Sequence, residues 1–322
     1  MGNRMQQLYL GVEIGGTKQQ IAVCDAQGQV IDMVSEKVAH ENGAADILDW
    51  LERKIPQLLL QYPDIESIGV GFGGPLETET GRVLISVQVP GWKDFKLRCW
   101  FEESFGMKTT VVVDTVAGGY AELMLGSGRD SDKFFYTNIG TGIGGSLFIN
   151  GYTWDGIGYG ASYLGNTYIA DWTASESGAV TRIESLCGGV SIEKRLRTPG
   201  YIPPESMLMT LCEGEILRVD CKMVRQAAEE GDTFALEELD RVGHSFGIGL
   251  ANTISMLGVD RISIGGGLAN LGKWILEPIQ KYADQYVFIS GKERYQIVIC
   301  SLMDYNVPIG AALYARDGFK TL

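Results

Sequence analysis

The sequence is poor in histidine and in long apolar runs, and both shortages narrow its possible functions. Among 322 residues there are two histidines, His40 and His244. They leave little room for a histidine-based catalytic triad or a histidine metal site. No apolar run approaches the roughly 18 residues of a membrane span, so no membrane contact is expected. Residues 1–16 also lack the apolar core of a signal peptide.

Basic residues are in deficit as well. Lys and Arg number 27 against 40 Asp and Glu, which gives a net charge of -13. Such a charge disfavours a nucleic-acid surface, because phosphates are repelled, so no nucleic-acid partner is expected. The six cysteines are scattered without the paired spacing of disulfide or zinc motifs. They indicate reduced thiols, mostly in the core, and a cytoplasmic location.

Glycine is abundant, with 43 residues, and a hydrophobic content of 45% is that of an ordinary globular protein. The length is sufficient for two domains. Short β-branched runs alternate with helical spacing, which predicts an α/β fold. Strands are predicted at 8–14, 19–24, 30–38, 65–72, 111–113, 134–138, 146–149, 261–264 and 297–300. Helices are predicted at 44–60, 95–105, after 114, at 181–196, 222–230 and 233–257, from about 268 to 282, and at 309–315. Residues 150–180 are expected to be irregular.

A strand, a glycine turn and a strand occur twice, at 8–24 and 134–149. This repetition indicates two related halves. Glycine-rich turns can hold phosphates, since their backbone amides form a concave donor surface that a ligand can approach closely. Thr17 and Thr141 add hydroxyl donors, and Lys18 adds a positive charge. Gly265–Gly267, between a predicted strand and helix, is a third such turn.

Two other nucleotide motifs are excluded by context. The ranges 69–74 and 140–145 both match G-x-G-x-x-G, but a dinucleotide-binding loop needs a helix directly after it. A proline and an acidic turn follow the first match, and a strand follows the second. No G-x-x-x-x-G-K-[ST] motif occurs, which excludes a P-loop.

The stretch VVVDTVAGGYAE at 111–122 holds the strongest candidate for catalysis. Asp114 follows a short buried strand and precedes a helical pattern. Open α/β sheets place their chemistry at the carboxyl ends of such strands. The alternative is that Asp114 only caps the following helix. The stretch by itself leaves both interpretations open.

Taken together, the ordered motifs resemble those of the ROK family of sugar kinases, within the hexokinase and actin superfamily. The matching stretches are EIGGTK at 13–18, GVGFGGP at 69–75, VPGWKD at 89–94, VVVDTVAGGYAE at 111–122, NIGTGIGGSLFINGYTWDG at 138–156, ISIGGGLAN at 262–270 and PIGAALYA at 308–315. The resemblance covers nearly the whole chain. It implies a two-domain α/β fold of the ribonuclease-H-like (actin/hexokinase) type with an interdomain cleft. The small domain is expected at 1–113 plus 306–322, and the large one at 114–305.

The resemblance also implies an activity, an ATP-dependent carbohydrate kinase in which Asp114 acts as the base and Mg²⁺ accompanies ATP. Glu13 is expected close to the magnesium, and a homodimer is the family expectation. The nucleotide is expected at Gly15, Gly16, Thr17, Lys18, Gly140, Thr141, Gly142, Gly265, Gly266 and Gly267. The acceptor is expected at Gly74, Val113, Asp114, Tyr163, Asn166 and Glu184.

The chain departs from the family pattern mainly on the acceptor side. Val113 and Val116 stand where asparagines are usual, Tyr163 replaces a glutamate and Asn166 a histidine. Ser175, Ser177 and Arg182 stand where zinc-binding cysteines are usual, Glu184 is kept, and Glu13 replaces an aspartate. We therefore expect no zinc site, and a modified sugar or cyclitol rather than glucose as acceptor.

Two alternatives to an active kinase follow from these departures. The first is a sugar- or nucleotide-binding protein that has lost catalysis. The second is a transcriptional repressor of the same family, which the acidic composition and the roughly seven residues before the first strand disfavour.

Overall fold

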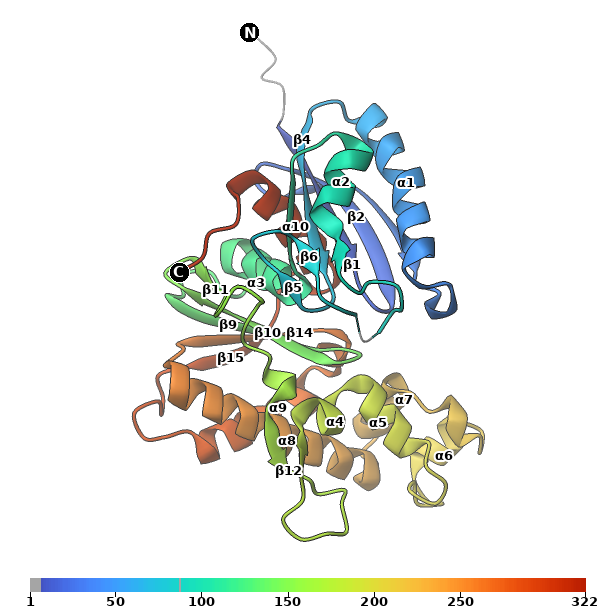
Figure 1. Ribbon diagram of the computed structural model, residues 1–322. Coiled ribbons are helices and arrows are strands. Elements are labelled where there is room, and N and C mark those ends of the chain that lie inside the picture. Colours follow the sequence, from blue (N-terminus) through green and yellow to red (C-terminus); the bar gives the residue numbers. More distant parts are fainter. Residues whose placement is uncertain (1–6, 87) are drawn as a thin grey trace. The chain divides into compact units, whose positions relative to one another are not determined.

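The computed structural model describes residues 7–86 and 88–322. The chain forms two compact units (Figure 1). The first contains the described residues up to Asp132, together with Ser146–Ser162 and Ser301–Leu322. The second contains Lys133–Gly145 and Tyr163–Cys300. Residues 1–6 belong to the predicted small domain and to the segment inspected for a signal peptide, and they lie outside the described residues.

The first unit is built on a five-stranded sheet with the order β3-β2-β1-β4-β8. The strands are β1 (Leu8–Ile14), β2 (Lys18–Asp25), β3 (Val30–Lys37), β4 (Ile65–Phe72) and β8 (Thr109–Val113). The first three form an antiparallel meander, whereas β1, β4 and β8 run parallel. The carboxyl ends of these parallel strands therefore meet at one edge of the sheet.

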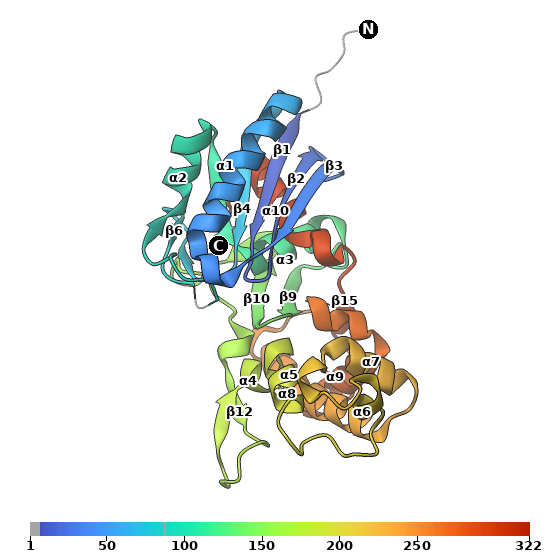
Figure 2. The same cartoon turned by 90° about the vertical axis from the view of Figure 1, so that its right-hand side faces the viewer.

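Helices cover both faces of this sheet. Figures 1 and 2 show α1 (Gly43–Gln61) and α2 (Leu97–Phe105) on the face opposite α10 (Asn306–Asp317). The backbone of α10 approaches β1 and β4 closely. A Cβ at Gly11 would lie 1.8 Å from the carbonyl oxygen of Pro308, and one at Gly69 would lie 1.8 Å from that of Ala311. Glycine at both positions permits this packing.

The borders of the two units differ from the predicted domain borders after 113 and before 306. Helix α3 (Asp114–Leu125) belongs to the first unit because it packs on α10, where the rings of Tyr120 and Tyr314 stack at 4.2 Å. Residues 146–162 also belong there, since the Thr153 and Tyr314 hydroxyls are 2.6 Å apart. Apolar contacts of α3 with α10, rather than chain order, set these borders.

A second five-stranded sheet repeats the order of the first, β11-β10-β9-β14-β15. Its strands are β9 (Lys133–Ile139), β10 (Ile143–Ile149), β11 (Tyr152–Trp154), β14 (Arg261–Gly265) and β15 (Gln296–Ile299). Here too an antiparallel pair is followed by parallel neighbours, β9, β14 and β15. This matching order agrees with the two related halves expected from the sequence.

The helices of the second unit are organised around α8 (Thr233–Leu257) and α9 (Lys273–Tyr286). They pack through small residues, because a Cβ at Gly243 would lie 2.3 Å from the Cβ of Pro278. The remaining helices are α4 (Ile183–Cys187), α5 (Gly189–Leu196), α6 (Met207–Leu211) and α7 (Cys221–Glu229). Short 3-10 turns are η1 (His40–Asn42), η2 (Leu164–Asn166), η3 (Ile216–Arg218), η4 (Gly267–Leu271) and η5 (Met303–Tyr305).

Two sequence predictions about local structure were wrong. The predicted helix 181–196 is instead a strand, β13 (Val180–Arg182), followed by α4 and α5, which Gly188 separates in an extended conformation. Residues 150–180 are not all irregular, since β12 (Tyr168–Ala170) pairs antiparallel with β13. The loop joining these strands projects from the helices of the second unit in both views (Figures 1 and 2).

A small antiparallel sheet in the first unit was also not predicted. It joins β5 (Leu76–Glu77), β6 (Arg82–Val83) and β7 (Phe95–Lys96), whose two-residue strands are too short to show alternation. Among the helices of the described ranges, none is both long and apolar enough to cross a membrane.

Candidate active site

Asp114 lies where the carboxyl ends of the parallel strands meet. Val113 ends β8 and is buried, and Asp114 opens α3. One carboxylate oxygen, Oδ1, accepts a hydrogen bond from the adjacent Thr115 amide at 2.7 Å. Val113 holds the N-cap position and makes no side-chain cap bond, so the Asp114 carboxylate satisfies a first-turn amide while its other oxygen is left for a second role. The second oxygen, Oδ2, lies 3.4 Å from where a Cβ of Gly73 would stand.

Burial raises the pKa of Asp114 to about 6, and the Thr115 amide opposes this shift. A carboxylate with such a pKa is ionised at neutral pH yet still basic enough to accept a proton in a reaction. The position and the pKa of Asp114 therefore suit a general base.

Glu13, near the end of β1, forms the second acidic group of this edge. It is buried, and this burial raises its pKa to about 7. The Lys18 ammonium lowers the pKa, whereas the charges of Asp114 and Asp304 raise it further. These shifts place Glu13 in one electrostatic cluster with Asp114.

Lys18 is held inside this acidic cluster. Its ammonium donates to the backbone carbonyl of Asp304 at 3.1 Å and lies 3.8 Å from Glu13 Oε2 and 3.7 Å from Asp304 Oδ1. With its amide oriented to suit these neighbours, Gln20 accepts from Lys18 at 3.2 Å and donates to Glu13 Oε2 at 3.2 Å. Sequence reasoning missed Asp304, because it lies 286 residues from Lys18 and in no recognised motif.

The first glycine turn connects β1 and β2 as a tight hairpin. The Gly15 amide donates to the carbonyl of Lys18 at 3.2 Å, and the Gly73 amide donates to the carbonyl of Ile14 at 2.8 Å. Gly15, Gly16, Thr17 and Lys18 thus lie at the same sheet edge as Asp114. Gly74 follows β4 there, with its amide bonded to the Phe72 carbonyl.

The side chain of Glu184 contacts the second glycine turn, Gly140–Gly142. Its carboxylate Oε2 accepts a hydrogen bond from the Ile143 amide at 2.8 Å. A Cβ on Gly142 would lie 2.4 Å from the same oxygen, so glycine at 142 makes room for Glu184. At Gly140 a Cβ would meet nothing closer than 3.9 Å. The structure thus brings Gly140, Thr141, Gly142 and Glu184 together within the second unit.

The third glycine turn, Gly265–Gly267, follows β14, and it too contains both crowded and uncrowded glycines. Gly266 has a positive φ of 83°, which favours glycine, and a Cβ there would meet Ile139 backbone at 2.6 Å. Gly265 faces the Tyr136 ring, whereas a Cβ on Gly267 would meet nothing within 4 Å. Gly140 and Gly267 are therefore the positions of the second and third turns at which a Cβ would meet no close neighbour.

The remaining predicted acceptor residues lie on the segment that enters α4. Tyr163 directly precedes η2, and Asn166 is the last residue of η2. The backbone amide of Asn166 donates to the backbone carbonyl of Tyr163 at 3.0 Å. Asn166 Oδ1 accepts a hydrogen bond from Arg182 Nη1 at 3.2 Å. Asn166 and Arg182, which stand where a histidine and a zinc-binding cysteine are usual, thus contact each other directly. The sequence did not predict this contact, because Asn166 lies in η2 and Arg182 at the end of β13, 16 residues apart.

Nothing in the described residues forms a ready metal site. Across residues 7–86 and 88–322, no group of three or more His, Cys, Asp or Glu side chains is arranged to hold a metal ion. The residues at the family zinc positions fit zinc poorly, since they offer no thiolate or imidazole. Glu13 fits magnesium better, because that ion takes carboxylate oxygens together with substrate phosphates.

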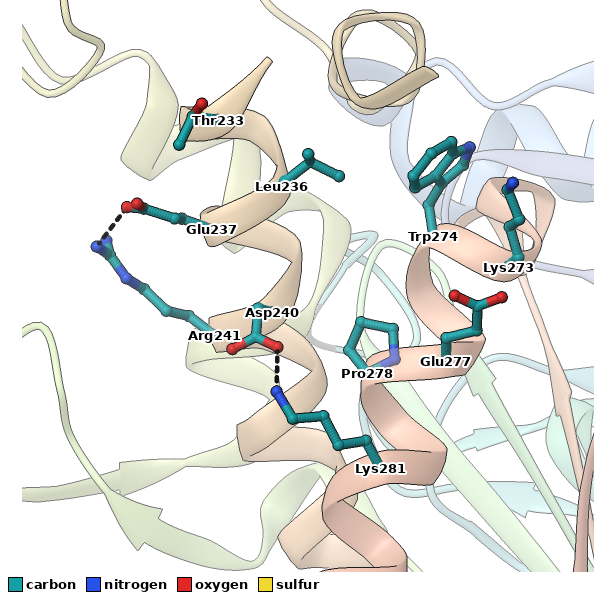
Figure 3. Close-up of a pocket in the computed structure, with 10 residues that line it drawn as sticks. All are labelled: Thr233, Leu236, Glu237, Asp240, Arg241, Lys273, Trp274, Glu277, Pro278 and Lys281. Carbon is teal, nitrogen blue, oxygen red and sulfur yellow. Dashed lines mark hydrogen bonds and ion pairs between the residues drawn. The ribbon is translucent and has the colours of Figure 1, made fainter. Parts of the chain in front are cut away.

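Two cavities differ in whether the predicted site residues line them. One, of about 720 Å³, adjoins the cluster through Lys18, Gln20 and Asp304. The other, of about 620 Å³, lies between α8 and α9 (Figure 3). Its charges are largely paired with each other, as in Asp240–Lys281 at 3.0 Å. None of the predicted site residues lines this second cavity.

Known proteins share this architecture. A ROK family glucokinase from Streptomyces griseus, solved in complex with glucose and AMPPNP, superposes with a TM-score of 0.84 at 25% identity. The match covers 97% of this chain and 100% of that one. The fold is therefore that of the actin/hexokinase-type sugar kinases, as predicted.

Sequence comparisons agree with the fold. A glucokinase of Thermotoga maritima is 28% identical over 315 residues, which are 96% of this chain and 97% of the relative. A xylose repressor of Caldicellulosiruptor bescii is 23% identical over 313 residues, 94% of this chain and 76% of the repressor. The model of the ROK family matches residues 9–318. The chain belongs to the ROK family.

Proposed function

We propose that this protein is an ATP-dependent sugar kinase with Asp114 as its catalytic base. It is a phosphotransferase with an alcohol group as acceptor, which the glucokinase relatives support. The observation that carries the residue assignment is the place of Asp114 at the carboxyl edge of three parallel strands, with a pKa raised to about 6. Asp114 orients the acceptor hydroxyl and accepts its proton.

The glycine turns hold the phosphates in this proposal. Gly140 and Gly267 have room for a ligand beside the backbone, and the turn containing Gly15 and Lys18 lies beside Asp114. The donor is ATP, since the Streptomyces griseus relative was solved with AMPPNP. Bound magnesium supplies neutralisation of the phosphate charge. Glu13 is the residue we assign to it, because its cluster holds three carboxylates against one ammonium.

Acceptor recognition is assigned to Gly74, Val113, Tyr163, Asn166 and Glu184. The main chain beside Val113 is the relevant part of that residue, since its side chain is buried. We also propose a cytoplasmic homodimer. The cytoplasmic location is supported by the six cysteines, which are all free thiols. Sedimentation of the untagged protein would measure its oligomeric state.

The test is a coupled assay that detects ADP over plain hexoses, N-acetylated hexosamines, sugar acids and cyclitols. Acceptor-dependent ADP formation that needs Mg²⁺ is expected. Nucleotide binding without turnover of any acceptor would instead support the inactive sugar- or nucleotide-binding protein.

A further inference from the structure

The hydrogen bond between Arg182 and Asn166 fixes what Asn166 can offer a ligand. A guanidinium has five N–H donors and no acceptor, so the Asn166 atom facing it must be the carbonyl oxygen. That oxygen lies 3.2 Å from Arg182 Nη1. The amide NH₂ consequently points away from Arg182 and presents two donors.

Backbone contacts hold the two residues in place. Arg182 pairs with Tyr168 across the β12–β13 ladder, and the Ile183 amide donates to the Thr167 carbonyl at 3.0 Å. Asn166 and Arg182 therefore occupy adjoining positions just before α4 begins. Both are exposed, so a ligand can reach them.

The pair carries a positive charge that the neighbouring chain does not neutralise. Within residues 7–86 and 88–322, no carboxylate lies within 4 Å of the Arg182 guanidinium. Glu184, two residues further on, has one carboxylate oxygen engaged by the Ile143 amide. Asn166 and Arg182 together thus offer several donors, whereas their one side-chain acceptor, the Asn166 oxygen, already accepts from Arg182 through one of its two lone pairs.

We propose that Asn166 and Arg182 form a donor subsite for an acceptor substituent that only accepts hydrogen bonds, a carboxylate or an acyl carbonyl. The inference rests on the proposed function, in which Asn166 contacts the acceptor. A hydroxyl both donates and accepts, and only the remaining lone pair of the Asn166 oxygen can take its hydrogen, so it uses these donors less fully. A carboxylate or carbonyl oxygen accepts from both residues, and a guanidinium suits such planar groups.

Matched acceptors test this proposal with the full-length protein. Glucose is the parent compound, gluconate is its open-chain acid with a carboxylate at C1, and N-acetylglucosamine carries an acyl carbonyl on C2. Phosphorylation and, separately, calorimetric binding are measured for each. The variants are Arg182→Gln, Arg182→Lys and, as a control, Arg218→Gln, which removes an exposed arginine paired with Glu213.

One or both of the substituted acceptors is expected to bind more tightly than glucose. Arg182→Gln should weaken that binding about tenfold to a hundredfold, the scale of one charge-assisted hydrogen bond. It should leave glucose binding, the KM for ATP and the melting temperature nearly unchanged. Arg182→Lys should fall between, and Arg218→Gln should behave as wild type. Gluconate or N-acetylglucosamine as the preferred compound identifies the carboxylate or the carbonyl.

Other outcomes overturn the subsite. It is refuted if glucose binds at least as well as both substituted compounds, or if Arg182→Gln weakens all three equally. Phosphorylation of gluconate and N-acetylglucosamine without any dependence on Arg182 leaves the kinase intact and removes the subsite. Binding of gluconate or N-acetylglucosamine that depends on Arg182, without any phosphorylation, supports the subsite and refutes the kinase.

Discussion

The sheet edge at Asp114 and the segment Tyr163–Glu184 organise their polar groups in opposite ways. At the edge, Glu13 is buried and Asp114 half-buried, and burial raises the pKa of both carboxylates. In the segment, Asn166 and Arg182 are exposed and bonded to each other, with no shared buried charge.

The difference between buried and exposed polar groups indicates which of the two regions tolerates substitutions. Replacing a buried charged group leaves its partners unpaired in a low dielectric, which is costly. Exposed polar residues on a short hairpin can be exchanged at small cost, because water replaces lost contacts. The edge accordingly keeps the family pattern apart from Glu13, Val113 and Val116, whereas the segment has changed at most of its functional positions.

The largest effect is expected at the edge, from Asp114→Asn. An amide cannot take up the proton that the hydroxyl of the sugar acceptor loses, so turnover should fall about 10²–10⁴-fold. Nucleotide affinity and the melting temperature should stay close to wild type. Turnover with saturating ATP and acceptor, together with nucleotide titration, measures both. Wild-type turnover in this variant would show that Asp114 is structural. The wild-type kcat/KM should also decline below a pH of about 6, as Asp114 becomes protonated.

The next effect concerns the stability of the same half of the molecule. Glu122, fully buried in α3, accepts hydrogen bonds from the amides of Ser127 (2.8 Å), Ser301 (3.0 Å) and Leu302 (2.7 Å). Glu122→Gln turns an NH₂ toward these donors and should cost about 3–4 kcal/mol of unfolding free energy, measured in urea. The exposed Glu237→Gln is the control, with a loss below about 1 kcal/mol. Equal stabilities for both variants would refute the anchoring role of Glu122.

A smaller effect should appear in the pH dependence of stability. The folded pKa of Glu13 is about 7 against an ordinary value of 4.5, so the folded protein retains a proton that the unfolded chain has lost between these values. Stability should therefore fall as pH rises from 4.5 to 7, by on the order of 2–3 kcal/mol for this group. Glu13→Gln should remove that part of the slope in urea titrations. An unchanged slope would mean that Glu13 titrates normally.

Much of the edge was predictable because its signals are local. The β-branched run before Asp114 and the glycines after β1 and β14 are read from neighbouring residues. The relation between the two halves followed from the repeated strand–glycine–strand pattern, whereas the strand order of each sheet was not predicted. Asp304 was not predictable, since its contact with Lys18 joins residues 286 positions apart.

The segment was predictable only in part. Strands of three residues carry too little alternation to reveal the β12–β13 hairpin, and the apolar spacing of 181–196 resembled one helix. The role of Glu184 beneath Gly142 was also hidden, because the contact depends on how α4 packs against the turn. Residue identities indicate that the segment departs from the family pattern, whereas its contacts depend on how the folded chain packs.

The smallest expected effect is that of a metal chelator on the segment. Protein contacts already hold it, since the Trp172 indole donates to Ser245 Oγ at 2.9 Å and its ring lies 4.8 Å from the Arg195 guanidinium. The β12–β13 ladder and the Asn166–Arg182 hydrogen bond add to these contacts, so we expect the segment to keep its conformation without a metal ion. We expect no zinc in the untagged protein and no change in melting temperature after chelation, whereas Trp172→Ala should lower that temperature. One zinc per chain, with a fall in melting temperature when it is removed, would show that metal rather than the indole holds this segment.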